Sequence, residues 1–169
     1  MAYSVQAFAD DATDTFTDER YPLGSIRFET ESEVETGDAS LVGPRVMVFV
    51  KAGIALPANE LVEKNAVSTS YVGKPSAAGV GTHPFSLLGV AVVTIPLNSY
   101  GWIVKQGECA VKSAGVAAGN IVGTSGATAG TVIPVVANAS AITDTRGEAV
   151  GIALTATTGG LSDVYINIP

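Results

Sequence analysis

The side chains that could catalyse a reaction are few in this sequence and stand far apart. His83 is the single histidine and lies between Thr82 and Pro84 in a Gly- and Pro-rich stretch. A catalytic base acts on a nucleophile within hydrogen-bond reach, and no nucleophile motif accompanies His83. Cys109 is the single cysteine and lies among small residues, where a thiol behaves as a small buried apolar group. We therefore expect this protein not to be an enzyme.

The acidic and glycine-rich segments do not have the spacing of a metal, sugar-cleaving or phosphate site. The run Asp10–Asp18 has Ala12 where an EF-hand needs its second ligand and lacks the loop glycine, which leaves a looser calcium site as the alternative. The glutamates between residues 29 and 35 alternate along one strand face, which favours a solvated face over a pair of catalytic acids. The glycines of residues 115–130 are not followed by the Gly-Lys-Ser/Thr of a phosphate loop. We expect no metal and no cofactor.

Charge is scarce and unevenly placed. Of the 169 residues, 47% are hydrophobic and 15% are charged, whereas a charged fraction of about 25% is typical. Residues 1–40 carry ten acidic and two basic side chains, a net charge of −8, and residues 41–169 carry a net charge of +1. An acidic end on a nearly neutral body argues against nucleic-acid binding, which needs clustered Lys and Arg. It fits contact with a basic protein surface or simple solvation.

No part of the sequence is expected to enter or cross a membrane. The N-terminal residues MAYSVQAFADDA have neither the basic nor the apolar region of a signal peptide. No apolar run approaches the roughly 18 residues that a membrane-spanning helix needs. A lone cysteine cannot form an intrachain disulfide. Synthesis in the cytoplasm follows from these features.

Hydrophobic patterning predicts strands and turns along the whole chain. Residues 26–35 alternate, which predicts a strand with Ile26, Phe28 and Val34 facing inward and the glutamates facing water. No segment has sustained helical spacing. The other predicted strands, separated by Gly- and Pro-containing turns, are 45–51, 88–95, 103–105, 131–137, 150–156 and 163–168. This pattern predicts an all-β fold, a compact β-sandwich or barrel of short strands.

The domain boundary is expected near residue 24. Residues 1–24 are polar and acidic and predict an extended N-terminal arm, with a disordered tail as the alternative. Residues 25–169 are expected to form a single all-β domain. The stretch 87–122 is its centre and carries Tyr100-Gly101-Trp102, with the only tryptophan. Large aromatic side chains dominate cores and interfaces, so the interface candidates are Tyr3, Phe8, Phe16, Tyr21, Tyr100 and Trp102.

The sequence contains a short internal repeat. Val50-Lys51-Ala52-Gly53 precedes Ala58–Val62, and Val104-Lys105-Gln106-Gly107 precedes Ala118–Val122. Both read V-K-x-G, a spacer, and then A-[NG]-x-[LI]-V. Two copies are too few for a solenoid. We expect two similar β-loop units in one barrel.

Several short motifs resemble the capsid decoration, or cement, proteins of tailed phages. The motifs lie within residues 40–160 and are Val48–Gly53, Leu88–Ala91, Tyr100–Gly107 and Val150–Leu154. The resemblance implies an all-β virion protein, commonly a homotrimer, that binds the major capsid protein on the outer surface of the assembled head. It implies that the protein holds neighbouring capsomers together and has no catalytic residues.

The charge distribution agrees with an outer location, and two other classes of protein stay open. Packaged DNA is a dense polyanion and would repel a segment with a net charge of −8. The first alternative is another virion part, a head-fibre base or a tail component. The second is a carbohydrate-binding module, although such modules present several aromatic side chains on one face and this chain has few.

Overall fold

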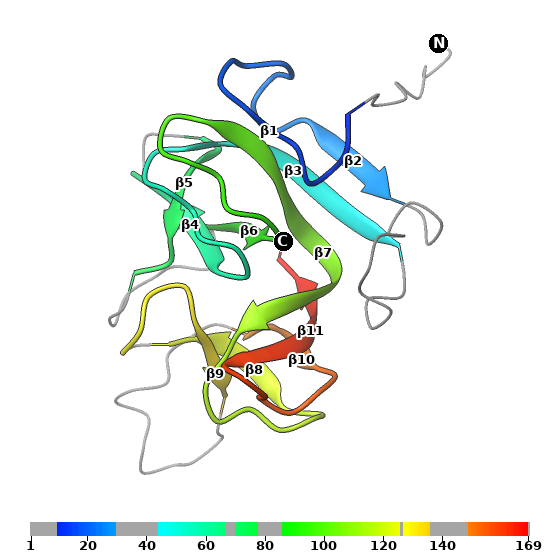
Figure 1. Cartoon of the computed structure of the whole chain (residues 1–169). Coiled ribbons are helices and arrows are strands. Elements are labelled where there is room, and N and C mark those ends of the chain that lie inside the picture. Colours follow the sequence, from blue (N-terminus) through cyan, green and yellow to red (C-terminus); the bar gives the residue numbers. More distant parts are fainter. Residues whose placement is uncertain are drawn as a thin grey trace.

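The computed structural model describes residues 10–29, 44–66, 70–77, 86–125, 127–135 and 149–168. Within these ranges the chain forms eleven β-strands and no α-helix, so the predicted all-β fold is confirmed (Figure 1). The strands are β1 (Thr15–Phe16), β2 (Ile26–Glu29), β3 (Arg45–Ala52), β4 (Leu61–Lys64), β5 (Val72–Pro75), β6 (Leu87–Ala91), β7 (Tyr100–Lys112), β8 (Ile121–Thr124), β9 (Val132–Pro134), β10 (Ala149–Ala153) and β11 (Leu161–Asn167). No helix of the described part has the length and hydropathy to cross a membrane.

Five strands close into a first barrel. Antiparallel pairing joins β3 to β7, β7 to β6, β6 to β4 and β4 to β5, and β5 returns to β3 as a parallel neighbour. Alternate residues of each strand point into such a ring, which small and β-branched apolar side chains can fill. The buried cluster inside is Val48, Val50, Ala52, Leu56, Val62, Leu88, Ala91, Ile95 and Ile103.

A second barrel is built on the other half of β7. Residues 106–112 of β7 pair with β11, followed by β10, β8 and β9 in order. A parallel bridge between Ser113 and Val132 brings β9 back to the end of β7 and closes the ring. Figure 1 shows β7 running from the upper barrel into the lower one. One strand of 13 residues therefore belongs to both barrels.

The two barrels repeat the same plan. Strands β3 to β7 of the first barrel correspond in order and pairing to β7 to β11 of the second. The connection that follows β3 turns at Asn59 and the matching one that follows β7 turns at Gly119, both with positive φ, 63° and 82°. The matching strands β6 and β10 each contain a glycine, Gly89 and Gly151. A Cβ added at either position would collide with a backbone carbonyl of the next strand. The second part of the sequence repeat, Ala58–Val62 and Ala118–Val122, thus lies at matching positions of two barrels, in place of two units in one barrel.

The register of this duplication differs from the one that the sequence motif implied. Lys51 pairs with Tyr100 on β7, and Lys112 pairs with Leu161 on β11. Val50-Lys51 therefore corresponds to Val111-Lys112, and the expected match to Val104-Lys105 is wrong. The sequence motif does not reveal this register, because the second connection is one residue shorter and begins with Ser113 instead of an alanine.

The expected orientation of the strand at residues 26–35 is wrong. The described strand is β2, in which Phe28 is 73% exposed and Glu29 is 2% exposed. Glu29 lies directly opposite Arg45 of β3, and the two charges form an ion pair of 2.8 Å. The alternating pattern predicts two different faces for β2, but it does not tell which face is buried. The buried Arg45 of β3 places Glu29 on the inside. Residues 30–35, including Val34, lie outside the described residues.

The described part of the predicted arm, residues 10–24, packs on the first barrel. Thr15 and Phe16 form β1, which pairs with the first two residues of β7. The Gly24 N–H donates a hydrogen bond of 2.9 Å to the Phe49 carbonyl. These contacts make residues 10–24 an outer layer of the first barrel.

Candidate interaction surfaces

Four of the six predicted interface aromatics meet in one cluster around Phe49 of β3. The ring centroids of Trp102, Tyr21, Phe16 and Tyr100 lie 5.1, 5.3, 6.1 and 6.1 Å from the Phe49 centroid. Trp102 and Phe49 are fully buried and Phe16 is buried. The aromatics of the N-terminal segment therefore anchor it to its own barrel. The other two candidates, Tyr3 and Phe8, lie outside the described residues.

Polar contacts fix the same segment. The Tyr21 hydroxyl donates a hydrogen bond of 2.6 Å to Asp10, and this bond raises the pKa of Tyr21. The Asp11 carboxylate accepts hydrogen bonds from the backbone N–H and the hydroxyl of Thr13, which lower the pKa of Asp11. These carboxylates therefore hold local turns together. Among the described residues, no three His, Cys, Asp or Glu side chains group as metal ligands. His83 lies outside them.

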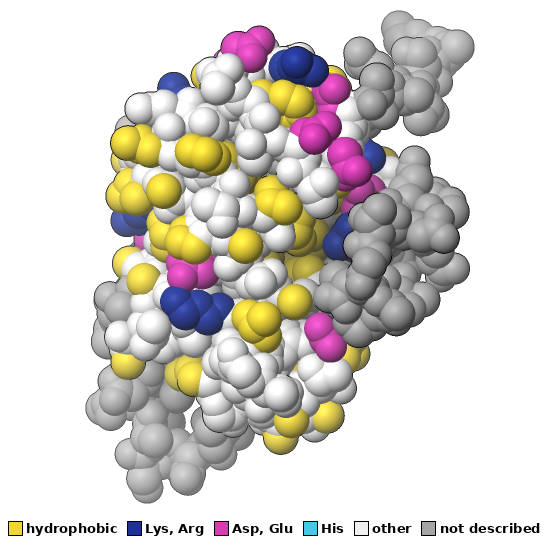
Figure 2. Space-filling model, in the orientation of Figure 1, with side chains coloured by type: hydrophobic (Ala, Val, Ile, Leu, Met, Phe, Trp, Pro, Cys, Tyr) yellow, Lys and Arg dark blue, Asp and Glu magenta, His cyan; other side chains and the backbone are white. Residues whose placement is uncertain are grey.

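Two exposed apolar side chains lie on linked turns at one end of the first barrel. The β3–β4 and β6–β7 connections are joined by backbone hydrogen bonds, among them the Leu56 N–H to the Ile95 carbonyl at 2.9 Å. Ile54 and Leu97, which we call the turn tip, are 50% and 56% exposed on these connections. Hydrophobic side chains gather over these connections at the upper left of Figure 2. Sequence reasoning missed this pair, although GIALPAN and VVTIPLN align around it.

A row of exposed apolar side chains crosses the second barrel. Ile121, Ile152 and Tyr165 lie directly opposite one another on β8, β10 and β11, and their exposed fractions are 51%, 51% and 45%. Glu108 on β7 lies opposite Tyr165. Directly opposed residues point to the same side of a sheet. We call Ile121, Ile152 and Tyr165 the outer row.

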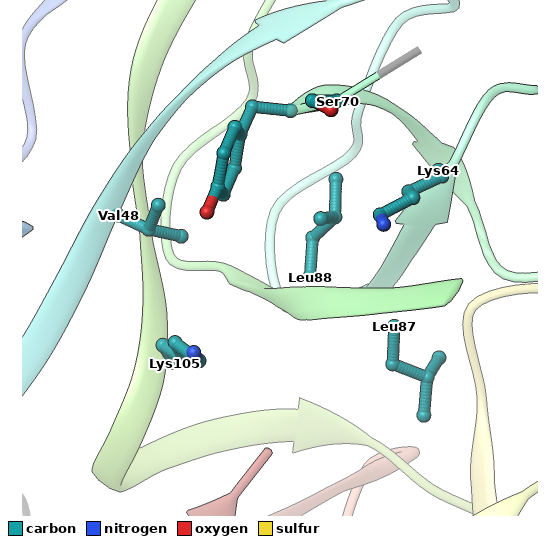
Figure 3. Close-up of a pocket in the computed structure, with 7 residues that line it drawn as sticks. Val48, Lys64, Ser70, Leu87, Leu88 and Lys105 are labelled. Carbon is teal, nitrogen blue, oxygen red and sulfur yellow. The ribbon is translucent and has the colours of Figure 1, made fainter. Parts of the chain in front are cut away.

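The first barrel has a pocket of about 140 Å³. It is lined by Val48, Lys64, Ser70, Tyr71, Leu87, Leu88 and Lys105. Lys64 follows the core residue Val62 by two positions and Lys105 follows the core residue Ile103 by two, so both lysines occupy inward-facing positions. Figure 3 shows the two lysines on either side of Leu88. We call this pocket the lysine mouth.

The two lysines of this pocket differ from the other described cations. Ion pairs tie down Arg20, Arg27, Arg45, Lys74 and Lys112. Lys51 lies over the Tyr100 ring at 5.5 Å. Within the described ranges, Lys64 and Lys105 have no carboxylate within ion-pair distance. The two lysines lie on different strands, β4 and β7, so they come together only when the barrel closes.

Cys109 is fully buried in the second barrel, and burial raises the pKa of its thiol to about 12. The reactive form of a cysteine is the thiolate. At neutral or mildly alkaline pH the native thiol therefore stays protonated and inert, as a small apolar core group.

We expect Cys109 to react with a thiol reagent only when the protein unfolds. At pH 8 the native rate should be on the order of 1000-fold below the rate in denaturant, because the thiolate fraction falls tenfold per pKa unit. Above about pH 9 the unfolded thiol loses its proton while the native thiol keeps it, so stability should decrease with rising pH. Absorbance of the released reagent measures the rate, and rapid labelling of the native protein would contradict the assignment.

Comparisons with known proteins include a structural likeness to a phage protein. No family model and no curated protein matches the chain. It is similar to the N base of the head fibre gp8.5 of bacteriophage phi29, with a TM-score of 0.47 and 16% identity over 72% of this chain and 92% of that chain. A likeness of this size fixes neither a shared fold nor a shared role.

Proposed function

We propose that this protein is a structural component of a tailed-phage virion that binds the outside of the assembled head and stabilises it. The motifs that resemble decoration proteins are now assigned to strands β3, β6, β7 and β10, the framework of both barrels. These motifs therefore support a framework like that of decoration proteins, and they do not form the binding surface.

The proposed binding role rests on the turn tip, the exposed pair Ile54 and Leu97. Ile54 and Leu97 are large apolar side chains exposed on turns that hydrogen bonds hold together, so they lose little freedom when a partner covers them. The acidic residues 10–24 run beside the turn tip, because β1 pairs with the residues that follow the Leu97 turn. Asp and Glu side chains lie at the top and the upper right of Figure 2. An apolar centre with acidic surroundings suits a partner surface that has an apolar recess and basic residues.

Binding of this kind stabilises a shell without any chemistry. A protein that binds the closed shell and not the disrupted one raises the stability of the shell by mass action. Many copies on a symmetric shell also gain avidity from weak single contacts. The partner is accordingly the major capsid protein.

Replacing Ile54 and Leu97 together by serine is expected to lower occupancy on heads at least tenfold. Loss of two exposed anchors removes contact energy on the order of 1–2 kcal/mol each, whereas folding should be unaffected because both side chains are half exposed or more. Leu161→Ser, a partly exposed leucine of the second barrel, is the matched control. Occupancy is measured by sedimentation of heads with bound protein.

Two further observations decide between the proposal and its alternatives. Heads that lack the protein should release their DNA at lower temperature than complete heads. Electron microscopy with a labelled protein should place it on the outer capsid surface. Unchanged occupancy of the double variant would refute the role of the turn tip, and a label on a fibre or the tail would favour the alternative virion parts.

A further inference from the structure

The outer row of the second barrel has a buried counterpart in the first barrel. Ala91 pairs with Ile103 in the first barrel, and Ala153 pairs with Val164 in the same way in the second. Ala91 therefore corresponds to Ala153, and Ile103 corresponds to Val164. On this register Leu61, Val90 and Val104 correspond to the outer row, and all three are fully buried. The same row of the sheet is thus covered in one barrel and open in the other.

The second barrel covers the row of the first. Leu61, Val90 and Val104 belong to one apolar cluster with Cys109 and Ile166 of the second barrel. The Leu61 N–H donates a hydrogen bond of 2.9 Å to the Gly130 carbonyl, and Lys112 pairs with Glu60 at 2.7 Å. The row of the first barrel therefore closes an end of the second barrel, and this contact joins the two units.

The lysine mouth is the matching end of the first barrel, and it is open. Val48, Lys64 and Lys105 correspond in register to Cys109, Thr124 and Ile166, which are all buried. Within each chain, the row of the first barrel covers an end of the second barrel. One row and one barrel end remain uncovered. The uncovered row is on the second barrel and the uncovered end is on the first.

Charge makes these two open surfaces complementary. Lys64 and Lys105 add two positive charges to the end of the first barrel. Glu108 lies opposite Tyr165, and Asp163 precedes Tyr165 by two positions on β11 and so shares its face. Two carboxylates beside the outer row thus match two ammonium groups around the mouth.

We propose that copies of this chain associate head to tail, with the outer row of one copy closing the lysine mouth of the next. The junction repeats between chains the contact that already joins the two barrels within a chain. It also covers Ile26 and Phe28, because Ile26 lies directly opposite Val48 at the edge of the mouth. Such a heterologous contact closes into a ring when the rotation permits.

Two variants test the junction from its two sides. Lys64→Glu with Lys105→Glu places carboxylates against carboxylates and blocks the mouth. Ile152→Asp blocks the outer row. Each variant alone is expected to be monomeric by light scattering, whereas the wild type and Lys51→Glu, a reversed lysine outside the mouth, should be oligomeric.

The mixture of the two variants gives the decisive result. The intact mouth of the Ile152→Asp chain can receive the intact row of the lysine variant, so an equimolar mixture should yield a dimer of one copy of each and nothing larger. Glu108→Lys replaces Ile152→Asp if that chain fails to fold by circular dichroism. A monomeric wild type, oligomers of either variant alone, or a mixture that stays monomeric would overturn the proposal. Purified protein suffices, so this test is independent of binding to heads.

Discussion

Replacing Glu29 with glutamine is expected to lower the free energy of unfolding by about 3–5 kcal/mol, the cost of breaking a buried ion pair. Glu29 is 2% exposed, and its two carboxylate oxygens lie 2.8 Å from Arg45 and 3.6 Å from Arg27. Glutamine keeps the shape but removes the carboxylate charge that pairs with the buried Arg45 guanidinium. Urea denaturation followed by circular dichroism measures the change.

The control is Glu19→Gln, which removes an exposed carboxylate from the same acidic region. It should change stability by no more than about 0.5 kcal/mol. The sequence pattern predicted the reverse for β2, a solvated glutamate face and a buried Phe28. Equal, small effects of the two substitutions would support a solvated glutamate face and contradict the buried ion pair.

Trp102→Ala is expected to cost about 3–5 kcal/mol, the range for removing a buried large aromatic side chain. Trp102 is fully buried and packs against both Phe49 of β3 and Tyr21 of the N-terminal segment, with ring-centroid distances of 5.1 and 5.4 Å. The substitution should therefore destabilise the first barrel and loosen residues 10–24 together. Denaturation measures the first effect, and limited proteolysis of the segment measures the second.

Leu97→Ala is the matched control, because Leu97 is large and apolar but more than half exposed. It should leave both stability and proteolysis nearly unchanged. If Trp102→Ala destabilises the barrel without loosening the N-terminal segment, the aromatic cluster does not anchor that segment.

The strands themselves could be predicted, because their signal is local. Residues 45–51 form β3 and residues 163–168 lie almost wholly in β11, as their β-branched and alternating patterns indicate. The two-barrel arrangement could not be predicted. It depends on pairing between β3 and β7 and between β7 and β11, which lie far apart in the chain. Nothing in the 13 residues of β7 shows that its two halves serve different rings.

The candidate surfaces depend on contacts between strands, which the local sequence pattern does not show. Aromatic content marked Phe16, Tyr21, Tyr100 and Trp102, and these side chains stabilise the inside of the chain. The exposed surfaces consist of aliphatic residues and lysines whose neighbourhood forms only after the barrels close. A sequence alignment of the two halves of the chain would have placed Lys64 beside Thr124 and Lys105 beside Ile166, and would have marked both lysines as departures from the repeat.

The shared strand also sets an order of events during synthesis. All five strands of the first barrel have been made once β7 emerges, so this barrel can close while the rest of the chain is still being translated. The partner of the second half of β7 is β11, the last strand, which emerges roughly 50 residues later, a delay of about 3–10 s at ordinary translation rates. During that interval residues 106–112 present an unpaired edge, the kind of edge that other chains can join. Nascent chains that are crowded on one messenger are therefore most exposed to mispairing at this strand.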